Sequence, residues 1–197
     1  MRMYHDEGNA NGEIPKQIPL FCSIITDMDK IRNIAFIDAQ NLNYSTVDSK
    51  PSWKVGLKQF RTYLKEKYNV DEAFYFLGCI DDRYSEMYDN IQRSGFILVF
   101  REHNSKLLSM KKGNVDTDIV FSIMKKLYKR EKFEKVILVS GDGDYFKMVQ
   151  FLIEEDKLCK ILMPVKNSSS SLYRQIPAKY RDYLDKPEIK KKIELKA

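Results

Sequence analysis

The stretch 136–145, VILVSGDGDY, decides the fold that this sequence predicts. An apolar run over 136–139 gives way at once to a polar, glycine-rich turn, and apolar residues then return at helical spacing. This pattern predicts a buried strand, a tight turn and the start of a helix. The two glycines allow unusual backbone angles and close approach. Asp144 is a candidate helix cap, and Asp142 is expected at the carboxyl end of a parallel strand, where open α/β sheets bind ligands.

The rest of the chain repeats this alternation of apolar runs and amphipathic stretches. Strands are predicted over 33–37, 73–77, 96–100, 135–139 and 158–163, with helices between them and one or two helical turns at 180–184. The alternation predicts a three-layer, doubly wound α/β domain with a mostly parallel sheet. The domain is expected to span 31–186. A polar segment over 1–30 is expected to be a flexible N-terminal tail, and 187–197 a frayed, basic C-terminal tail.

Composition limits the classes of site and partner. The 197 residues include 43% hydrophobic residues and carry a net charge of +6, which is compatible with a polyanionic partner but not diagnostic of one. The three cysteines form no CxxC pair, and the two histidines alone make no metal site. No stretch approaches the ~20 apolar residues of a transmembrane helix. We therefore expect reduced thiols, a cytoplasmic setting and no membrane contact.

Carboxylates occur at points that a parallel sheet would bring to one edge. Asp38 ends the strand 33–37, Asp142 ends the strand 135–139, and Asp116 starts the helix that leads into the latter strand. Hard oxygen ligands without histidine or cysteine suit Mg²⁺ or Mn²⁺ rather than zinc. Such ions activate a water and stabilise in-line displacement at phosphorus.

A carboxylate after a strand often only caps a helix, and that explanation stays open for Asp118 and Asp144. It is less favoured for Asp142, which lies between two glycines after a buried strand. It explains Asp38 poorly, because no helix is apparent at the next residue. Asp116 lies on the apolar stripe of its helix, where a carboxylate needs a partner.

Other polar residues are candidates for contact with a substrate. Asn41 and Ser140 add neutral oxygens beside the carboxylates. The segment 101–114 is polar, basic and long for a connection, and it carries Arg101, Lys111 and Lys112. Next to a carboxylate–metal centre these cations would attract phosphates, although a solvated surface is the usual fate of such clusters.

Three motifs together resemble the NYN-domain family, a branch of the PIN-like ribonuclease fold, and within it the LabA-like proteins. They are AFIDAQNL (35–42), KKGNVDTDI (111–119) and VSGDGDY (139–145). The resemblance covers about residues 33–185. It implies a five-stranded parallel sheet in the order 3-2-1-4-5.

The resemblance also implies a set of site residues. It implies Mg²⁺ or Mn²⁺ held by Asp38, Asp116 and Asp142, with Asp144 as a further acidic catalytic residue. It implies that Asn41 orients the substrate or a carboxylate, and Lys112 matches the lysine of the second motif. Asn114 is inserted in that motif, so that Asp116 and Asp118 both stay candidates for the ligand position, although the helical stripe favours Asp116.

The leading hypothesis is a Mg²⁺- or Mn²⁺-dependent endoribonuclease that cleaves single-stranded RNA with an activated water, leaving by analogy a 5′-phosphate and a 3′-hydroxyl. A homodimer is compatible with this hypothesis. One alternative is a non-catalytic RNA-binding or regulatory module, which would gain nothing from clustered negative charge facing phosphate. Another is a phosphatase, but Gln40 stands where a haloacid-dehalogenase-like site would carry a second Asp.

Overall fold

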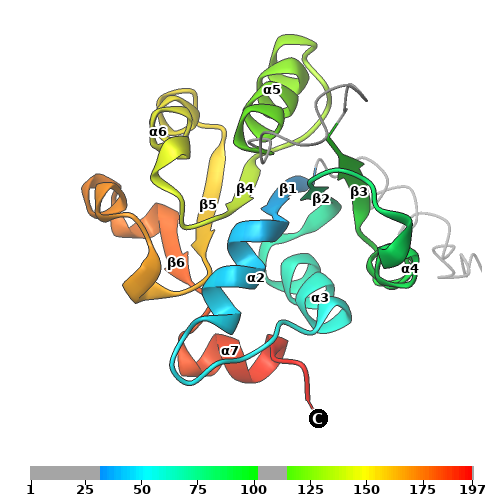
Figure 1. The fold of residues 1–197 in the computed structure, drawn as a ribbon. Coiled ribbons are helices and arrows are strands. Elements are labelled where there is room, and N and C mark those ends of the chain that lie inside the picture. The colour runs from blue at the N-terminus through cyan, green and yellow to red at the C-terminus, as the bar shows by residue number, and fades with distance from the viewer. Residues whose placement is uncertain (1–31, 102–114, 197) are drawn as a thin grey trace, which may run out of the picture. The chain divides into compact units, whose positions relative to one another are not determined.

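The computed structural model describes residues 32–101 and 115–196. In this part of the chain, helices cover both faces of one sheet (Figure 1). The expected N-terminal tail, 1–30, lies outside the described residues, as do Lys111 and Lys112 of the expected basic loop.

The sheet has six strands in the order β3-β2-β1-β4-β5-β6, and every neighbouring pair is parallel. The strands are β1 (Asn33–Asp38), β2 (Val70–Leu77), β3 (Ile97–Phe100), β4 (Val136–Val139), β5 (Leu158–Met163) and β6 (Arg181–Tyr183). The expected order of the first five strands is confirmed, and the expected number of strands is corrected from five to six.

The sixth strand replaces the helical turns that were expected at 180–184. Arg181 pairs with Ile161 and Asp182 with Leu162, in register with β5. A segment this short gains backbone hydrogen bonds from a neighbouring strand more readily than from a helix, whose first turn fixes several residues for one hydrogen bond. A single turn of 3₁₀ helix, Ala178–Tyr180, comes just before the strand.

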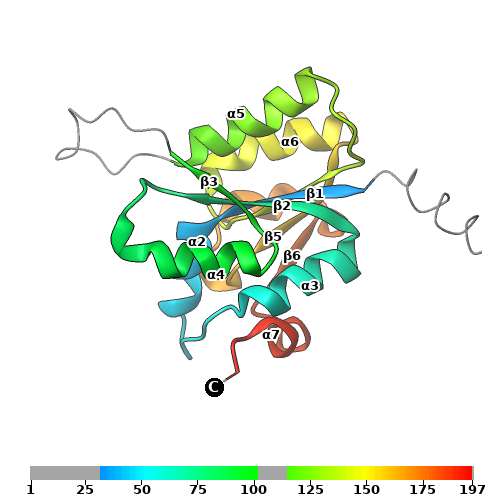
Figure 2. The same ribbon diagram turned by 90° about the vertical axis from the view of Figure 1, so that its right-hand side faces the viewer.

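The helices form two layers, as Figure 2 shows. They are α2 (Ala39–Val47), α3 (Leu57–Tyr68), α4 (Ser85–Arg93), α5 (Val115–Tyr128), α6 (Phe146–Glu154) and α7 (Pro187–Ile193). Alternate side chains of β1 lie on opposite faces of the sheet and pack with different helices. Ala35 and Ile37 pack with α2, α3, α4 and α7, whereas Ile34 and Phe36 pack with α5 and α6. Both faces of the central strands are therefore buried, as their unbroken apolar sequence predicts.

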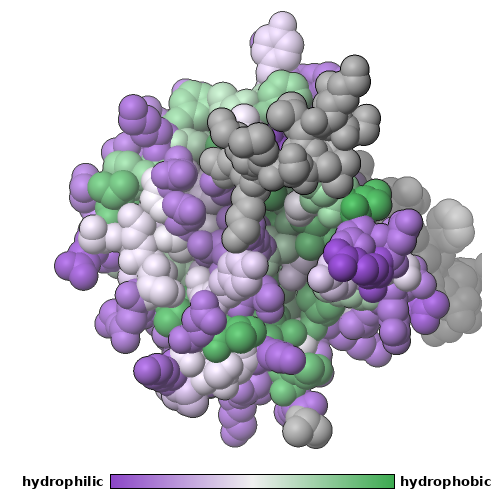
Figure 3. Space-filling model, viewed as in Figure 1, coloured by the Kyte–Doolittle hydropathy of each residue, from purple (hydrophilic) through white to green (hydrophobic). Residues whose placement is uncertain are grey.

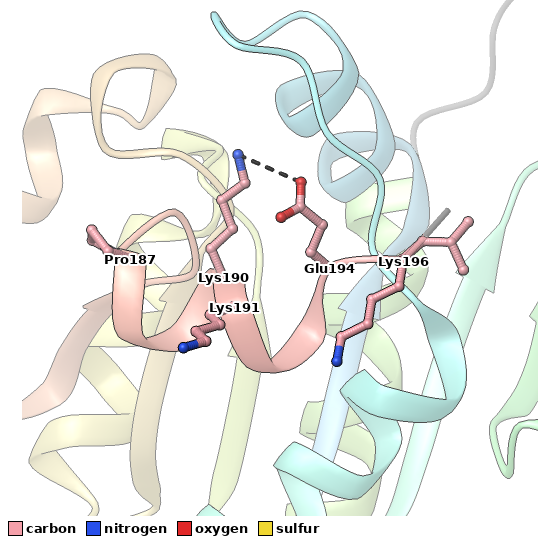
Figure 4. A pocket seen from close by; sticks show the side chains of 6 residues that line it. Pro187, Lys190, Lys191, Glu194 and Lys196 are labelled. Carbon is pink, nitrogen blue, oxygen red and sulfur yellow. Dashed lines mark ion pairs between the residues drawn. The ribbon is translucent and has the colours of Figure 1, made fainter.

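The C-terminal segment is a packed helix rather than a frayed tail. Ile189 and Ile193 of α7 are buried in the core that α3 also covers. Beyond the helix, the Leu195 amide donates to the Lys54 carbonyl. The lysines of α7 point to the surface, where Lys190 pairs with Glu194 at 3.7 Å (Figure 4). The expected fraying is wrong for 187–193, because two isoleucines four residues apart form an apolar stripe beneath the charges.

Two further observations concern the setting of the protein. Cys79 is exposed and Cys159 is half-buried, and both are free thiols. Within 32–101 and 115–196, the helices are all too short or too polar to cross a membrane.

Candidate metal centre

Asp38 is the last residue of β1 and lies at the carboxyl edge of the sheet. Its Oδ1 accepts a hydrogen bond of 2.9 Å from the Asn41 amide, so that it caps α2. No helix was expected directly after Asp38, and this expectation is wrong. The helix begins at Ala39 because a carboxylate at the N-cap satisfies one of its free amides.

The turn after β4 is also capped by its first aspartate. Asp142 Oδ1 accepts a 3.0 Å hydrogen bond from the Asp144 amide and begins η3 (Gly143–Tyr145), a turn of 3₁₀ helix that leads into α6. Asp144, the expected cap, lies inside this turn. Its side chain is exposed and is not used by the backbone.

Three carboxylates meet at this edge, and we call them the acidic cluster. Asp116 from the first turn of α5, with Asp142 and Asp144, each place a carboxylate oxygen within 4.8 Å of the other two. Asp118 is not in this group, and its Oδ2 is buried without a hydrogen-bond partner. Of the two candidates that the second motif left open, the structure brings Asp116 to the cluster.

Asp38 lies behind the acidic cluster rather than in it. Only 5% of its surface is exposed. The buried hydroxyl of Tyr145 connects the two, since it lies 3.2 Å from Asp38 Oδ2 and also contacts Asp116 Oδ1. The expected set of Asp38, Asp116 and Asp142 is therefore not the set that meets. Asp144 takes the place of Asp38.

Burial and mutual repulsion dominate the electrostatics. Burial raises the pKa of Asp38, and the charges of Asp116 and Asp142 raise it further, against the opposing hydrogen bonds from Asn41 and Tyr145. Burial and the neighbouring carboxylates also raise the pKa of Tyr145, which keeps its hydroxyl protonated. Since the surroundings disfavour the charge of Asp38, a cation bound nearby would favour that charge.

A family model described as NYN domain matches residues 33–183, from the start of β1 to the end of β6. The chain belongs to the NYN domain family. The match includes all four aspartates around the candidate centre. No curated protein matches the chain.

A solved structure supports the fold of this NYN domain. A crystal structure of a protein of unknown function from Vibrio parahaemolyticus RIMD 2210633 aligns with a TM-score of 0.65 and 20% identity. The alignment covers 85% of this chain and 98% of the other. At that identity the similarity shows the fold and says nothing of activity.

Asn41 and Ser140 hold the two strand ends of the NYN domain together. Asn41 Oδ1 accepts a 2.8 Å hydrogen bond from the Gly141 amide. Ser140 is fully buried, with its Oγ 3.4 Å from Asp38 Oδ2 and accepting from the Asp142 amide at 3.1 Å. Ser140 was expected to contact substrate. Its burial corrects this, because its polar contacts are all within the protein.

The two glycines of the turn make room for protein rather than for a ligand. A Cβ on Gly141 would lie 2.9 Å from Ser169 Oγ, and a Cβ on Gly143 would lie 2.6 Å from Ser170 Oγ. The serines belong to the segment before η5 (Ser171–Gln175), and the Ser170 amide donates to the Gly141 carbonyl at 2.9 Å. Neither glycine has a positive φ. Glycine is therefore needed at both positions because the serine segment approaches closely, and not because of unusual backbone angles.

Two tyrosines of the site were missed by sequence reasoning. Tyr145 reads as one of the apolar positions after the turn, and Tyr173 of η5 lies far along the chain, yet its hydroxyl donates to the Asp142 carbonyl. A tyrosine immediately after an acidic turn was the available signal for Tyr145. No local signal marks Tyr173. Among the expected basic contacts, Arg101 follows β3 and is half-buried.

The residues present fit a divalent cation. The acidic cluster offers hard oxygen donors from three side chains within 4.8 Å of one another. No described lysine or arginine forms an ion pair with Asp142 or Asp144. Hydrogen bonds to Asp116 and Asp142 fix their orientation, which is the support that ligating carboxylates need.

Proposed function

We propose that this NYN domain is a Mg²⁺- or Mn²⁺-dependent nuclease that hydrolyses RNA phosphodiesters. The observation that carries the proposal is the acidic cluster of Asp116, Asp142 and Asp144 at the carboxyl edge of the sheet. When bound there, a divalent ion would supply an activated water and would stabilise the charge that develops on the phosphate. The family match supports a nuclease-like domain.

The chain's own residues would have separate roles at this site. Asp116, Asp142 and Asp144 would hold the ion. Tyr145 would act as a positioning residue, because its hydroxyl contacts Asp116 and its raised pKa keeps the donor proton in place. Asp38 would add negative charge behind the cluster and fix the start of α2. Arg101, Lys111 and Lys112 remain the proposed contacts for phosphate oxygens.

A cleavage assay tests this proposal. The purified chain is incubated with a labelled single-stranded RNA and Mn²⁺ or Mg²⁺, and the products are separated on a gel. Cleavage is expected, with loss in EDTA. In metal sites, loss of an outer-shell partner lowers activity by about 10- to 100-fold. Asp142→Asn removes a proposed ligand itself and should lower the rate by more than that. Asp118→Asn, purified in the same way, is the matched control and should retain activity.

The outcomes separate this proposal from its main rival. Cleavage that survives both EDTA and Asp142→Asn would show that the site is wrong or that the activity is a contaminant. Metal-free RNA binding without turnover would favour a regulatory module. Analysis of the product ends should find 5′-phosphate and 3′-hydroxyl groups.

We further propose that the protein belongs to the LabA-like branch, on the basis of the three motifs. We also propose a reducing cytoplasmic setting, which suits the free Cys79 and Cys159 thiols.

A further inference from the structure

A groove of about 390 Å³ lies beside the ends of β1 and β2, on the face of the sheet that α2 covers. We call it the α2–α4 groove. Its walls come from α2, α4, the end of β2 and the chain after α7. Figure 3 shows hydrophobic side chains gathered in the recess of this face. Its lining includes Gln40, Asn43, Tyr44, Tyr75, Gly78 and Met87.

The groove begins next to Asp38, at the end of β1. Its residues Ala39 and Gln40 directly follow Asp38 in the chain. On the neighbouring strand, Phe76 pairs with Asp38, and Tyr75 before it lines the groove. A ligand that fills the groove would therefore lie at the carboxyl edge of the sheet, where Asp38 and the acidic cluster also lie.

The groove combines apolar walls with a few polar groups. Tyr44 and Met87 are 53% and 42% exposed, so that a ring and a thioether are accessible in the groove. The amides of Gln40 and Asn43 provide donors and acceptors, and Lys54 provides one cation. Apolar walls with few convergent polar groups are typical of pockets for small organic rings.

Tyr75 supplies a further polar group to the groove. It is only 7% exposed, yet its hydroxyl makes no hydrogen bond to any residue that the structure describes. Burial raises the pKa of Tyr75 to about 12, and the charge of Asp38 contributes to that rise. The hydroxyl therefore stays protonated near the candidate centre. The hydroxyl is not among the fully enclosed side-chain atoms that lack a partner, so it is accessible from the groove, where a ligand's polar atom would bond it.

We propose that the α2–α4 groove binds one unpaired nucleobase of an RNA strand whose phosphate lies at the acidic cluster. This inference rests on the proposed function and deepens it. The walls would contact the faces of the base, while Gln40, Asn43 and Tyr75 would bond its edge, as in recognition of splayed bases. A base inside a duplex has both faces stacked and cannot enter. The substrate class is therefore single-stranded RNA, or a loop or bulge.

Binding of an oligoribonucleotide that lacks one base tests the inference without using cleavage. Short single-stranded RNAs with an abasic nucleotide at each position in turn are titrated in Ca²⁺ by fluorescence anisotropy. One position should weaken binding by about 5- to 150-fold, the range for losing a stacked base. Gly78→Phe should block the groove and abolish this positional penalty. Gly78→Ala is the matched control, since a Cβ there meets no atom within 4 Å.

A second variant tests the inference if Gly78→Phe fails to fold. Tyr75→Phe retains the ring and removes the unpartnered hydroxyl, and should reduce the penalty at the same position. Equal binding of all abasic RNAs would overturn the inference, even if the protein cleaves RNA. A positional penalty without cleavage would sustain the groove and reject the nuclease. A change in oligomeric state with Gly78→Phe, at unchanged RNA binding, would show a protein interface and overturn it.

Discussion

Tyr145 Oη lies 3.2 Å from Asp38 Oδ2, although 107 positions separate the two residues in the chain. The same hydroxyl contacts Asp116, so that one buried tyrosine joins the ends of β1 and β4 to the start of α5. A side chain counted as apolar in the sequence pattern is therefore the polar link of the site. Its position makes the geometry of the carboxylates depend on three distant segments.

Replacement of Tyr145 by Phe should destabilise the fold and weaken the site. The variant removes the donor shared by Asp38 Oδ2 and Asp116 Oδ1, and loss of a hydrogen bond to a charged group costs about 1.5–3 kcal/mol. Urea unfolding should show a lower midpoint with an unchanged m-value. Tyr128→Phe, at a residue that is 89% exposed, is the control and should change nothing. Equal stability of the two variants would contradict the proposed role.

Asp38→Asn should stabilise the metal-free protein at neutral pH. The fold raises the pKa of Asp38, so that the wild type loses stability as pH rises from the ordinary value of 3.8 through the folded-state pKa. Each unit of raised pKa corresponds to about 1.4 kcal/mol, and asparagine caps α2 as well as aspartate does.

Thermal unfolding in EDTA across the acidic and neutral pH range measures this effect. The melting temperature of Asp38→Asn should exceed that of the wild type near pH 7, by about 2–4 °C for each kcal/mol. The difference should shrink towards pH 3.8, where the wild-type carboxyl is protonated. A difference that does not change with pH would show that the charge of Asp38 is not the cause.

Divalent ions should raise the melting temperature, because a ligand that binds only the folded state stabilises it. At a concentration of 100 times Kd the gain is about 2.7 kcal/mol. Asp142→Asn and Asp144→Asn should lose most of this gain, and Asp118→Asn should keep it. An equal response of all three variants to Mn²⁺ would place the ion elsewhere.

Gly143→Ala should destabilise the turn after β4. Its Cβ would lie 2.6 Å from Ser170 Oγ and 3.1 Å from Ser170 Cβ, and overpacking of this kind costs about 1–3 kcal/mol. Adding Ser170→Gly should restore part of the loss, because it removes the atoms in conflict. Gly78→Ala serves as the control in open space. Chemical unfolding of the wild type, Gly143→Ala, Ser170→Gly and the double variant gives the coupling free energy between positions 143 and 170, which should be clearly different from zero.

Ile193→Ala should show that α7 belongs to the fold. The side chain is fully buried beneath the lysines of the helix, and loss of such a residue costs about 2–5 kcal/mol. Ile80→Ala removes the same atoms from a residue that is 62% exposed and should cost less than about 0.5 kcal/mol. Similar unfolding midpoints for the two variants would mean that the C-terminal segment is dispensable.

The sequence by itself determined the layers and the central strands. The unbroken apolar runs 34–37 and 136–139 are typical of strands buried on both faces, and the alternation with amphipathic stretches specified a parallel sheet. These features are local, because the spacing of buried positions depends only on residues that are close together in the chain. For the same reason Asp38 and Asp142 were placed correctly at strand ends.

The tertiary structure alone decided which side chains meet. Asp144 rather than Asp38 joins Asp116 and Asp142, because the N-cap of α2 holds Asp38 behind Tyr145 while η3 turns Asp144 towards α5. The glycines of the turn face Ser169 and Ser170, which follow them by more than 25 residues. Such contacts depend on where each helix starts and on how distant segments pack, and no local periodicity encodes either.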